Sequence, residues 1–149
     1  MSSELLVEAR GQVEIATLNR PERLNALSEG LVDELNAYFG GLAERKEVRV
    51  VILRGAGRGF CAGLDIQEDR ATDGTPVLRT LRTQTSIGNI YRKMRACPQP
   101  IIALGHGAAA GGGLSLLLAS DVRYASPSFR CNAAYIRIGL GGCDMASSY

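Results

Sequence analysis

The chain has 149 residues, of which 46% are hydrophobic, 21% charged and 5% aromatic, and its formal net charge is +2. This composition is typical of a soluble globular protein with one core, and it excludes a collagen-like, disordered or disulfide-scaffold chain. The weak, scattered charge and the short apolar runs predict neither a nucleic-acid nor a membrane partner. No secretion signal is recognised, one histidine is present, and the four cysteines lack CxxC spacing. We therefore expect reduced thiols, a cytoplasmic location and no metal site.

The first half of the chain predicts two strands and a helix between them. Val13–Leu18 alternates in polarity like a strand. Ser28 is an expected N-cap of the helix that follows. The apolar face of this helix is predicted to carry Leu31, Leu35, Tyr38 or Phe39, and Leu42. Arg49–Arg54 contains an unbroken apolar block, which predicts a strand buried on both faces.

The second half predicts two more helices and three more strands. Val77–Cys97 is interpreted as a long helix that ends before Pro98. Its expected inward side chains are Val77, Leu78, Leu81, Ile87, Ile90, Tyr91 and Met94. The remaining predicted elements are a buried strand at Pro100–Leu104, a buried helix at Leu114–Ser120, and short strands at Val122–Ala125 and Phe129–Asn132. The alternation of strands and helices favours an α/β fold.

Two glycine-rich turns each follow a predicted buried strand. Gly63-Leu64 comes after the first of these strands, and Gly111-Gly112-Gly113 comes after the second and opens a helix. Glycine lets backbone N–H groups approach a ligand closely, and a helix start leaves such groups free. Two N–H donors that converge on one oxygen form an oxyanion hole. From the glycines alone, tight packing of helix against strand is the favoured explanation, and Gly111–Gly113 does not have the pattern of a phosphate-binding loop.

Four stretches of the sequence together resemble the crotonase superfamily, the enoyl-CoA hydratase/isomerase fold. They are Leu18-Asn19-Arg20-Pro21 with Asn25-Ala26-Leu27, Gly59–Ile66, Pro100–Ala103 with Gly107–Gly113, and Ser120–Ala125 with Ile138-Gly139-Leu140. The resemblance implies a ClpP-like α/β fold of repeated ββα units. It also implies that residues 1–149 form one acyl-CoA-binding core domain, truncated before the C-terminal helical region that lies beyond Tyr149.

The resemblance implies an acyl-CoA thioester substrate, no cofactor other than the coenzyme A of that substrate, and assembly into a homotrimer or hexamer. By motif position, the backbone N–H groups of Leu64 and Gly112 hold the thioester carbonyl. The implied substrate-binding positions are Arg23, Ala62, Leu64, Asp65, Ile66, Gly111 and Gly112. From the residues alone, Arg23 is equally well explained as a solvated side chain. We favour for Asp65 a structural bond of the Asx-turn type.

The sequence departs from the hydratases at both of their glutamate positions. Hydration needs one group to activate water and another to protonate the α-carbon. Ser115 and Tyr135 stand where the resemblance places the two glutamates. Neither side chain titrates near pH 7 when unperturbed, so a two-glutamate mechanism is not expected. Asp144 is the remaining candidate carboxylate, with Tyr135 as a hydrogen-bond donor, although Asp144 also fits a helix N-cap.

Three functions remain open on these residues. One is an enzyme of acyl-CoA proton transfer, isomerase or hydratase-like, that uses Asp144. Another is a non-catalytic acyl-CoA-binding protein that keeps the fold without the acids. A third is an aryl-CoA dehalogenase-like enzyme in which Asp144 is the nucleophile. We expect His106 to pack a loop, and Cys61 and Cys143 to be inert buried thiols.

Overall fold

A five-stranded sheet is the framework of the chain. The computed structural model describes residues 3–67 and 75–138. The strand order is β1-β2-β3-β4-β6. The strands span Leu5–Arg10 (β1), Val13–Leu18 (β2), Val50–Gly55 (β3), Ile101–Gly105 (β4) and Val122–Ala125 (β6). Only β1 is antiparallel to its neighbour, so the carboxyl ends of the other four strands meet at one edge of the sheet.

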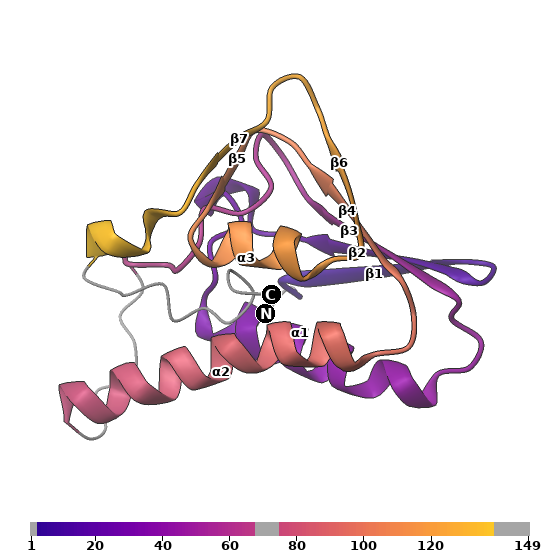
Figure 1. Cartoon of the computed structure of the whole chain (residues 1–149), viewed down its shortest axis with the longest axis horizontal. Coiled ribbons are helices and arrows are strands. Elements are labelled where there is room, and N and C mark those ends of the chain that lie inside the picture. The colour runs from indigo at the N-terminus through magenta and orange to yellow at the C-terminus, as the bar shows by residue number, and fades with distance from the viewer. Residues whose placement is uncertain (1–2, 68–74, 139–149) are drawn as a thin grey trace.

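A second, two-stranded sheet continues from that edge. It pairs β5 (Ala108–Ala110) in parallel with β7 (Arg130–Asn132). In Figure 1 these two strands lie above α3, beyond the ends of the larger sheet. The strands predicted at Val122–Ala125 and Phe129–Asn132 are therefore confirmed, but they belong to different sheets.

Three helices pack against the larger sheet. They are α1 (Glu29–Gly41), α2 (Pro76–Ala96) and α3 (Gly112–Ala119), with 3-10 turns η1 (Pro21–Arg23), η2 (Leu42–Glu44) and η3 (Ala134–Ile138). Figure 1 shows α1 and α2 side by side below the sheet. The predicted N-cap of α1 is confirmed, because Ser28 Oγ accepts the Leu31 N–H at 3.0 Å. Thr75 Oγ1 caps α2 in the same way by accepting the Leu78 N–H.

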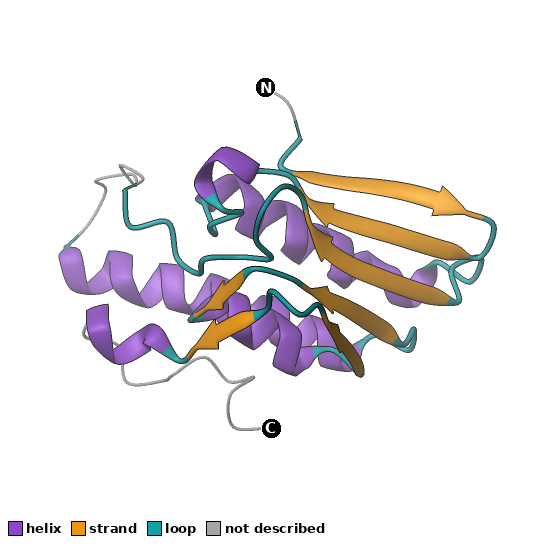
Figure 2. Ribbon diagram, turned by 90° about the horizontal axis from the view of Figure 1, so that it is seen from above, coloured by secondary structure: helices purple, strands orange, loops and turns teal. Residues whose placement is uncertain are grey.

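Only one face of the sheet is covered by the described elements. Figure 2 shows the helices behind the sheet. Val51 and Leu53 on the covered face of β3 are 0% exposed, whereas Val50 and Ile52 on the other face are partly exposed. The expectation that this strand is buried on both faces is therefore wrong. The fully buried core includes Leu18, Leu27, Leu31, Leu35, Phe39, Phe60, Ile90, Tyr91 and Ile101.

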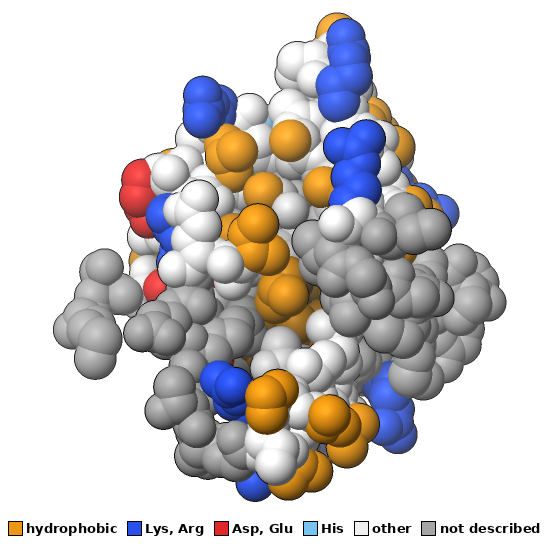
Figure 3. Space-filling model, turned by 90° about the vertical axis from the view of Figure 1, so that its left-hand side faces the viewer, with side chains coloured by type: hydrophobic (Ala, Val, Ile, Leu, Met, Phe, Trp, Pro, Cys, Tyr) orange, Lys and Arg blue, Asp and Glu red, His pale blue; other side chains and the backbone are white. Residues whose placement is uncertain are grey.

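The first half of α2 is less buried than its sequence pattern predicts. Val77, Leu78 and Leu81 are 76%, 48% and 60% exposed, so the expectation that they point inward is wrong. Figure 1 shows this half of the helix extending past the body of the molecule, and Figure 3 shows apolar side chains on the surface at that end. The predicted inward set is confirmed for the second half, Ile87, Ile90, Tyr91 and Met94.

Candidate active site

The two glycine turns meet at the carboxyl edge of the parallel strands. Cys61 bridges the main chain of β5, since its N–H donates to Ala108 O and its carbonyl accepts the Ala110 N–H at 3.0 Å. Gly63 has φ +89°, and a Cβ on it would lie 2.6 Å from Ala110 O and 3.5 Å from Gly112 N. Only glycine allows this approach. Close packing, one of the two explanations that the sequence offered for this turn, is therefore part of the role of Gly63.

The backbone N–H groups of Leu64 and Gly112 are left available by this packing. Leu27 donates to Gly63 O at 2.7 Å and accepts from Asp65 N at 3.1 Å. In a parallel bridge of this kind, the intervening N–H of Leu64 points to the other side. Gly112 is the first residue of α3, where an N–H has no partner within the helix. Within residues 3–67 and 75–138, neither N–H donates to another group of the chain.

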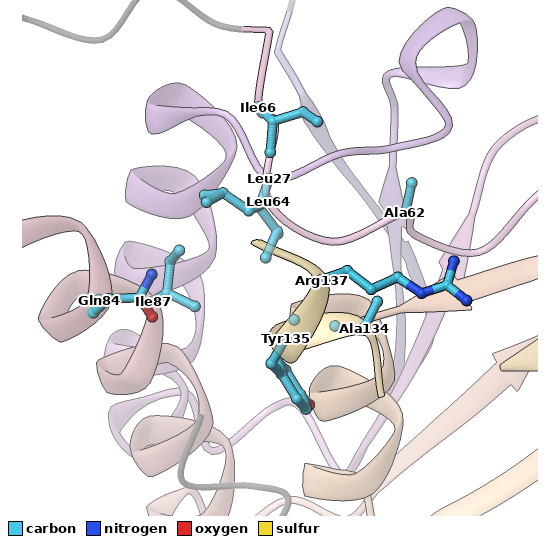
Figure 4. A pocket seen from close by; sticks show the side chains of 11 residues that line it. Leu27, Ala62, Leu64, Ile66, Gln84, Ile87, Ala134, Tyr135 and Arg137 are labelled. Carbon is cyan, nitrogen blue, oxygen red and sulfur yellow. The ribbon is translucent and has the colours of Figure 1, made fainter. Parts of the chain in front are cut away.

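Leu64 and Gly112 both border one cavity of about 220 Å³. Its walls come from the turn after β3, from α2 and from η3 (Figure 4). The lining is mainly apolar and consists of Leu27, Ala62, Leu64, Ile66, Gln84, Ile87, Gly111, Gly112, Ala134, Tyr135 and Arg137. None of these described lining residues carries a carboxylate, and Arg137 is the charged one among them.

Ser115 and Tyr135 form a buried hydroxyl pair at this cavity. Tyr135 Oη lies 2.6 Å from Ser115 Oγ. Ser115 is 0% exposed and Tyr135 is 7% exposed. The sequence places these side chains 20 residues apart, and the fold joins them because α3 and η3 pack together beside Gly111.

Asp65 is held by the loop rather than directed into the cavity. Its carboxylate accepts the Gln67 N–H at 3.1 Å, Arg20 Nη2 at 3.0 Å and Arg23 Nη2 at 3.1 Å. The bond to Gln67 confirms the expected Asx-type turn. Burial raises the pKa of Asp65, but these hydrogen bonds and charges outweigh it, and the pKa lies below its ordinary value. The Arg23 side chain, 36% exposed, is paired with this carboxylate.

Asn25 is a site-building residue that sequence reasoning did not assign. It is 0% exposed and adopts a left-handed φ of 54°. Its Nδ2 donates to the carbonyl groups of Ala56, Gly59 and Phe60 at 2.9–3.1 Å, and its Oδ1 accepts the Arg20 N–H. These bonds fix the loop that leads to the Gly63 turn. The available signal was an amide residue directly before the apolar pair Ala26-Leu27.

The comparisons with known proteins decide the family. The family model described as enoyl-CoA hydratase/isomerase matches residues 8–146. The chain belongs to the enoyl-CoA hydratase/isomerase family. A Mycobacterium leprae protein named "Probable enoyl-CoA hydratase echA12" is 40% identical over 94% of this chain and 49% of its own length. The chain thus spans about half the length of such relatives.

Solved structures of this enzyme family share the fold. A structure from Streptomyces coelicolor A3(2) matches with a TM-score of 0.90 at 41% identity, over 98% of this chain and 54% of that one. The enoyl-CoA hydratase of Mycobacterium smegmatis matches with a TM-score of 0.86 at 33% identity, over 99% of this chain and 56% of that one. The predicted resemblance and the α/β crotonase fold are confirmed.

The other residues singled out by the sequence lie in simpler surroundings. His106 Nε2 is 2.9 Å from Gly57 O, which agrees with loop packing. Cys61 is 0% exposed, and burial raises its pKa to about 12, as expected for an inert thiol. Asp144 and Cys143 lie outside the described residues. Among residues 3–67 and 75–138, no helix has the length and apolar character needed to cross a bilayer.

Proposed function

We propose that the chain binds an acyl-CoA thioester with its carbonyl oxygen between the N–H groups of Leu64 and Gly112. The observation that carries this proposal is the approach of the two turns, with a Gly63 Cβ position 3.5 Å from Gly112 N beside one apolar cavity. Both donors are backbone groups fixed by the fold, so they need no reorganisation as charge develops on the oxygen. One donor of this kind contributes about 3–4 kcal/mol of transition-state stabilisation.

The exposed end of the cavity is assigned to the coenzyme A part of the ligand. Ile66 is 70% exposed and Ala62 borders the cavity, so both lie where a long ligand leaves the protein. Arg23 is 36% exposed and paired with Asp65, the residue before Ile66, and we assign its guanidinium to ligand phosphates. Asp65 acts by holding this loop through its turn bond and its two arginine partners.

The proposed reaction is proton transfer on the enolate of the bound thioester, as an isomerase or a hydratase-like lyase. The two hydratase glutamates are replaced by Ser115 and Tyr135, so Asp144 is the proposed base and Tyr135 a hydrogen-bond donor. No cofactor beyond the coenzyme A of the substrate is needed for this chemistry. We further propose a homotrimer or hexamer as the working assembly and the cytoplasm as its location.

Turnover and binding together test this proposal. Crotonyl-CoA and a 3-enoyl-CoA are followed by absorbance, and the affinity for each is measured by calorimetry. Asp144→Asn should abolish isomerisation while the acyl-CoA affinity is kept. Gly112→Pro removes one donor at a helix position that tolerates proline, and should abolish turnover while affinity for free coenzyme A remains. Full activity of the Gly112→Pro variant would refute the oxyanion hole.

A non-catalytic acyl-CoA-binding protein is the second candidate. The buried Ser115–Tyr135 pair favours it, because these residues carry hydroxyl groups where the resemblance places the two hydratase glutamates. The same assays separate the two candidates. Measurable acyl-CoA affinity without turnover of either substrate selects the binding protein, and turnover that depends on Asp144 selects the enzyme.

A further inference from the structure

A short chain of hydrogen bonds leads from the cavity wall to the carbonyl group of Gly111. Tyr135 Oη is 2.6 Å from Ser115 Oγ, and Ser115 Oγ is 3.5 Å from Gly111 O. Figure 4 shows the Tyr135 hydroxyl pointing away from Leu64. Because both side chains are buried, water competes little for these bonds, and each bond polarises the next.

One arrangement of protons runs this chain toward the Gly111 carbonyl. The Gly111 carbonyl can only accept, and a serine hydroxyl has one proton to donate. When Ser115 donates that proton to Gly111 O, Tyr135 donates its own proton to Ser115 Oγ. Gly111 O also accepts the Ser115 N–H at 3.1 Å. Ser115 therefore supplies two donors to one carbonyl oxygen.

The Gly111 carbonyl and the Gly112 N–H belong to the same peptide group. Peptide resonance couples the two ends, so donors that draw electron density onto the oxygen leave the N–H more positive. We propose that Ser115 and Tyr135 are positioning residues that strengthen the Gly112 N–H as a donor to the thioester carbonyl. This inference rests on the proposed function, in which that N–H binds the carbonyl. It gives the two hydroxyl groups a role that requires no titration.

The stretching frequency of the bound carbonyl reports the strength of its donors. Butyryl-CoA labelled with carbon-13 at the thioester carbonyl is bound to the 149-residue chain, and isotope-edited infrared difference spectra are recorded. Binding should lower the carbonyl frequency. Ser115→Ala should lose roughly 10–30% of that lowering, the cooperative share of one hydrogen bond. Tyr135→Phe should lose a smaller part of it, because Tyr135 acts through one more bond.

A matched control is available at the C-terminal end of the same helix. Ser120 is 1% exposed, and its Oγ donates to Leu116 O at 2.9 Å. Ser120→Ala removes the same buried group from a carbonyl outside the glycine turn, so the bound frequency should equal that of the wild type. Thermal melting verifies that each variant folds. If Ser115→Ala does not fold, Ser115→Cys keeps the size with a much weaker donor and should show the same loss.

The outcomes separate this inference from the proposed function. A wild-type spectrum with no lowering on binding would overturn the proposed function itself. Normal lowering that persists in full in both Ser115→Ala and Tyr135→Phe overturns only the role of the hydroxyl pair. A loss in Tyr135→Phe alone also overturns it, because the tyrosine would then contact the ligand directly.

Discussion

Replacing Gly63 by alanine should separate steric packing from backbone strain at the meeting point of the two turns. Gly63 has φ +89°, and an added Cβ would lie 2.6 Å from Ala110 O. Gly11 has φ +63°, and an added Cβ would meet nothing within 4 Å. Gly11→Ala therefore carries the strain of a left-handed alanine alone, whereas Gly63→Ala carries the strain and the collision.

The magnitudes follow from these two contributions. A left-handed non-glycine residue costs about 1–2 kcal/mol. Overpacking against a neighbour that cannot move costs about 1–3 kcal/mol more. Ala110 is such a neighbour, because its N–H is bonded to Cys61 O at 3.0 Å and the Gly63 carbonyl is bonded to Leu27 N at 2.7 Å. We expect Gly63→Ala to lose roughly 2–5 kcal/mol of unfolding free energy and Gly11→Ala roughly 1–2 kcal/mol.

Thermal melting and ligand titration measure the two effects. Each kcal/mol should lower Tm by about 2–4 °C in a chain of this size. Because the collision displaces the Gly63–Leu64 peptide, Gly63→Ala should also lose about tenfold in affinity for butyryl-CoA, the equivalent of one hydrogen bond. Free coenzyme A has no thioester carbonyl, so its affinity should not change. Equal Tm values and equal butyryl-CoA affinities for the two variants would refute the reasoning.

Three further variants or conditions have defined outcomes. Gly88 lies inside α2, and none of the described residues comes within 4 Å of an added Cβ, so Gly88→Ala should stabilise the chain by about 0.5–1 kcal/mol in a urea melt; a destabilised variant contradicts this. The Asp65 pKa is lower in the folded chain, so its stabilising contribution is present above the unfolded value of about 3.9 and is lost as the pH falls through the folded value. Asp65→Asn should accordingly flatten the acid side of the stability curve. An unchanged slope would show that the Gln67 N–H bond and the pairing with Arg23 and Arg20 do not lower this pKa. Iodoacetamide at pH 8 should label the exposed Cys131 and not Cys61 in the folded chain, as peptide mapping can verify, and rapid labelling of Cys61 would contradict its burial.

The elements that follow from local chemistry were predictable from the sequence. Ser28 caps α1 because its hydroxyl reaches an N–H three residues away, which the sequence contains in full. The exposure of Val77 and Leu81 was not predictable. The apolar residues of α2 predict a buried face, but they do not indicate how much of that face the neighbouring helix covers. The uncovered face of β3 was missed for the same reason. Apolar residues predict that a strand is buried, but they do not indicate whether other elements cover one face of it or both.

The site was predictable only where a resemblance joined distant segments. The resemblance paired Leu64 with Gly112, while the glycines alone favoured tight packing. The role of Asn25 depends on three carbonyl groups more than 30 residues away, so the amide before Ala26-Leu27 marks the residue but not its partners. The strand at Ala108–Ala110 was also missed, since three alanines between glycines carry no strand signal apart from their partners.

The separation between backbone donors and side-chain chemistry lets the chain keep the family fold whichever side chains stand at positions 115 and 135. The N–H groups of Leu64 and Gly112 depend on the bridges at Leu27 and Cys61 and on the start of α3, and none of these contacts uses a side chain at position 115 or 135. A substitution at those two positions therefore changes the acid–base groups without dismantling the proposed hole. Under the proposed function, thioester recognition and proton transfer are then independent properties of the site. Because Ser115 still bonds Gly111 O, however, position 115 keeps one route by which a side chain tunes a backbone donor.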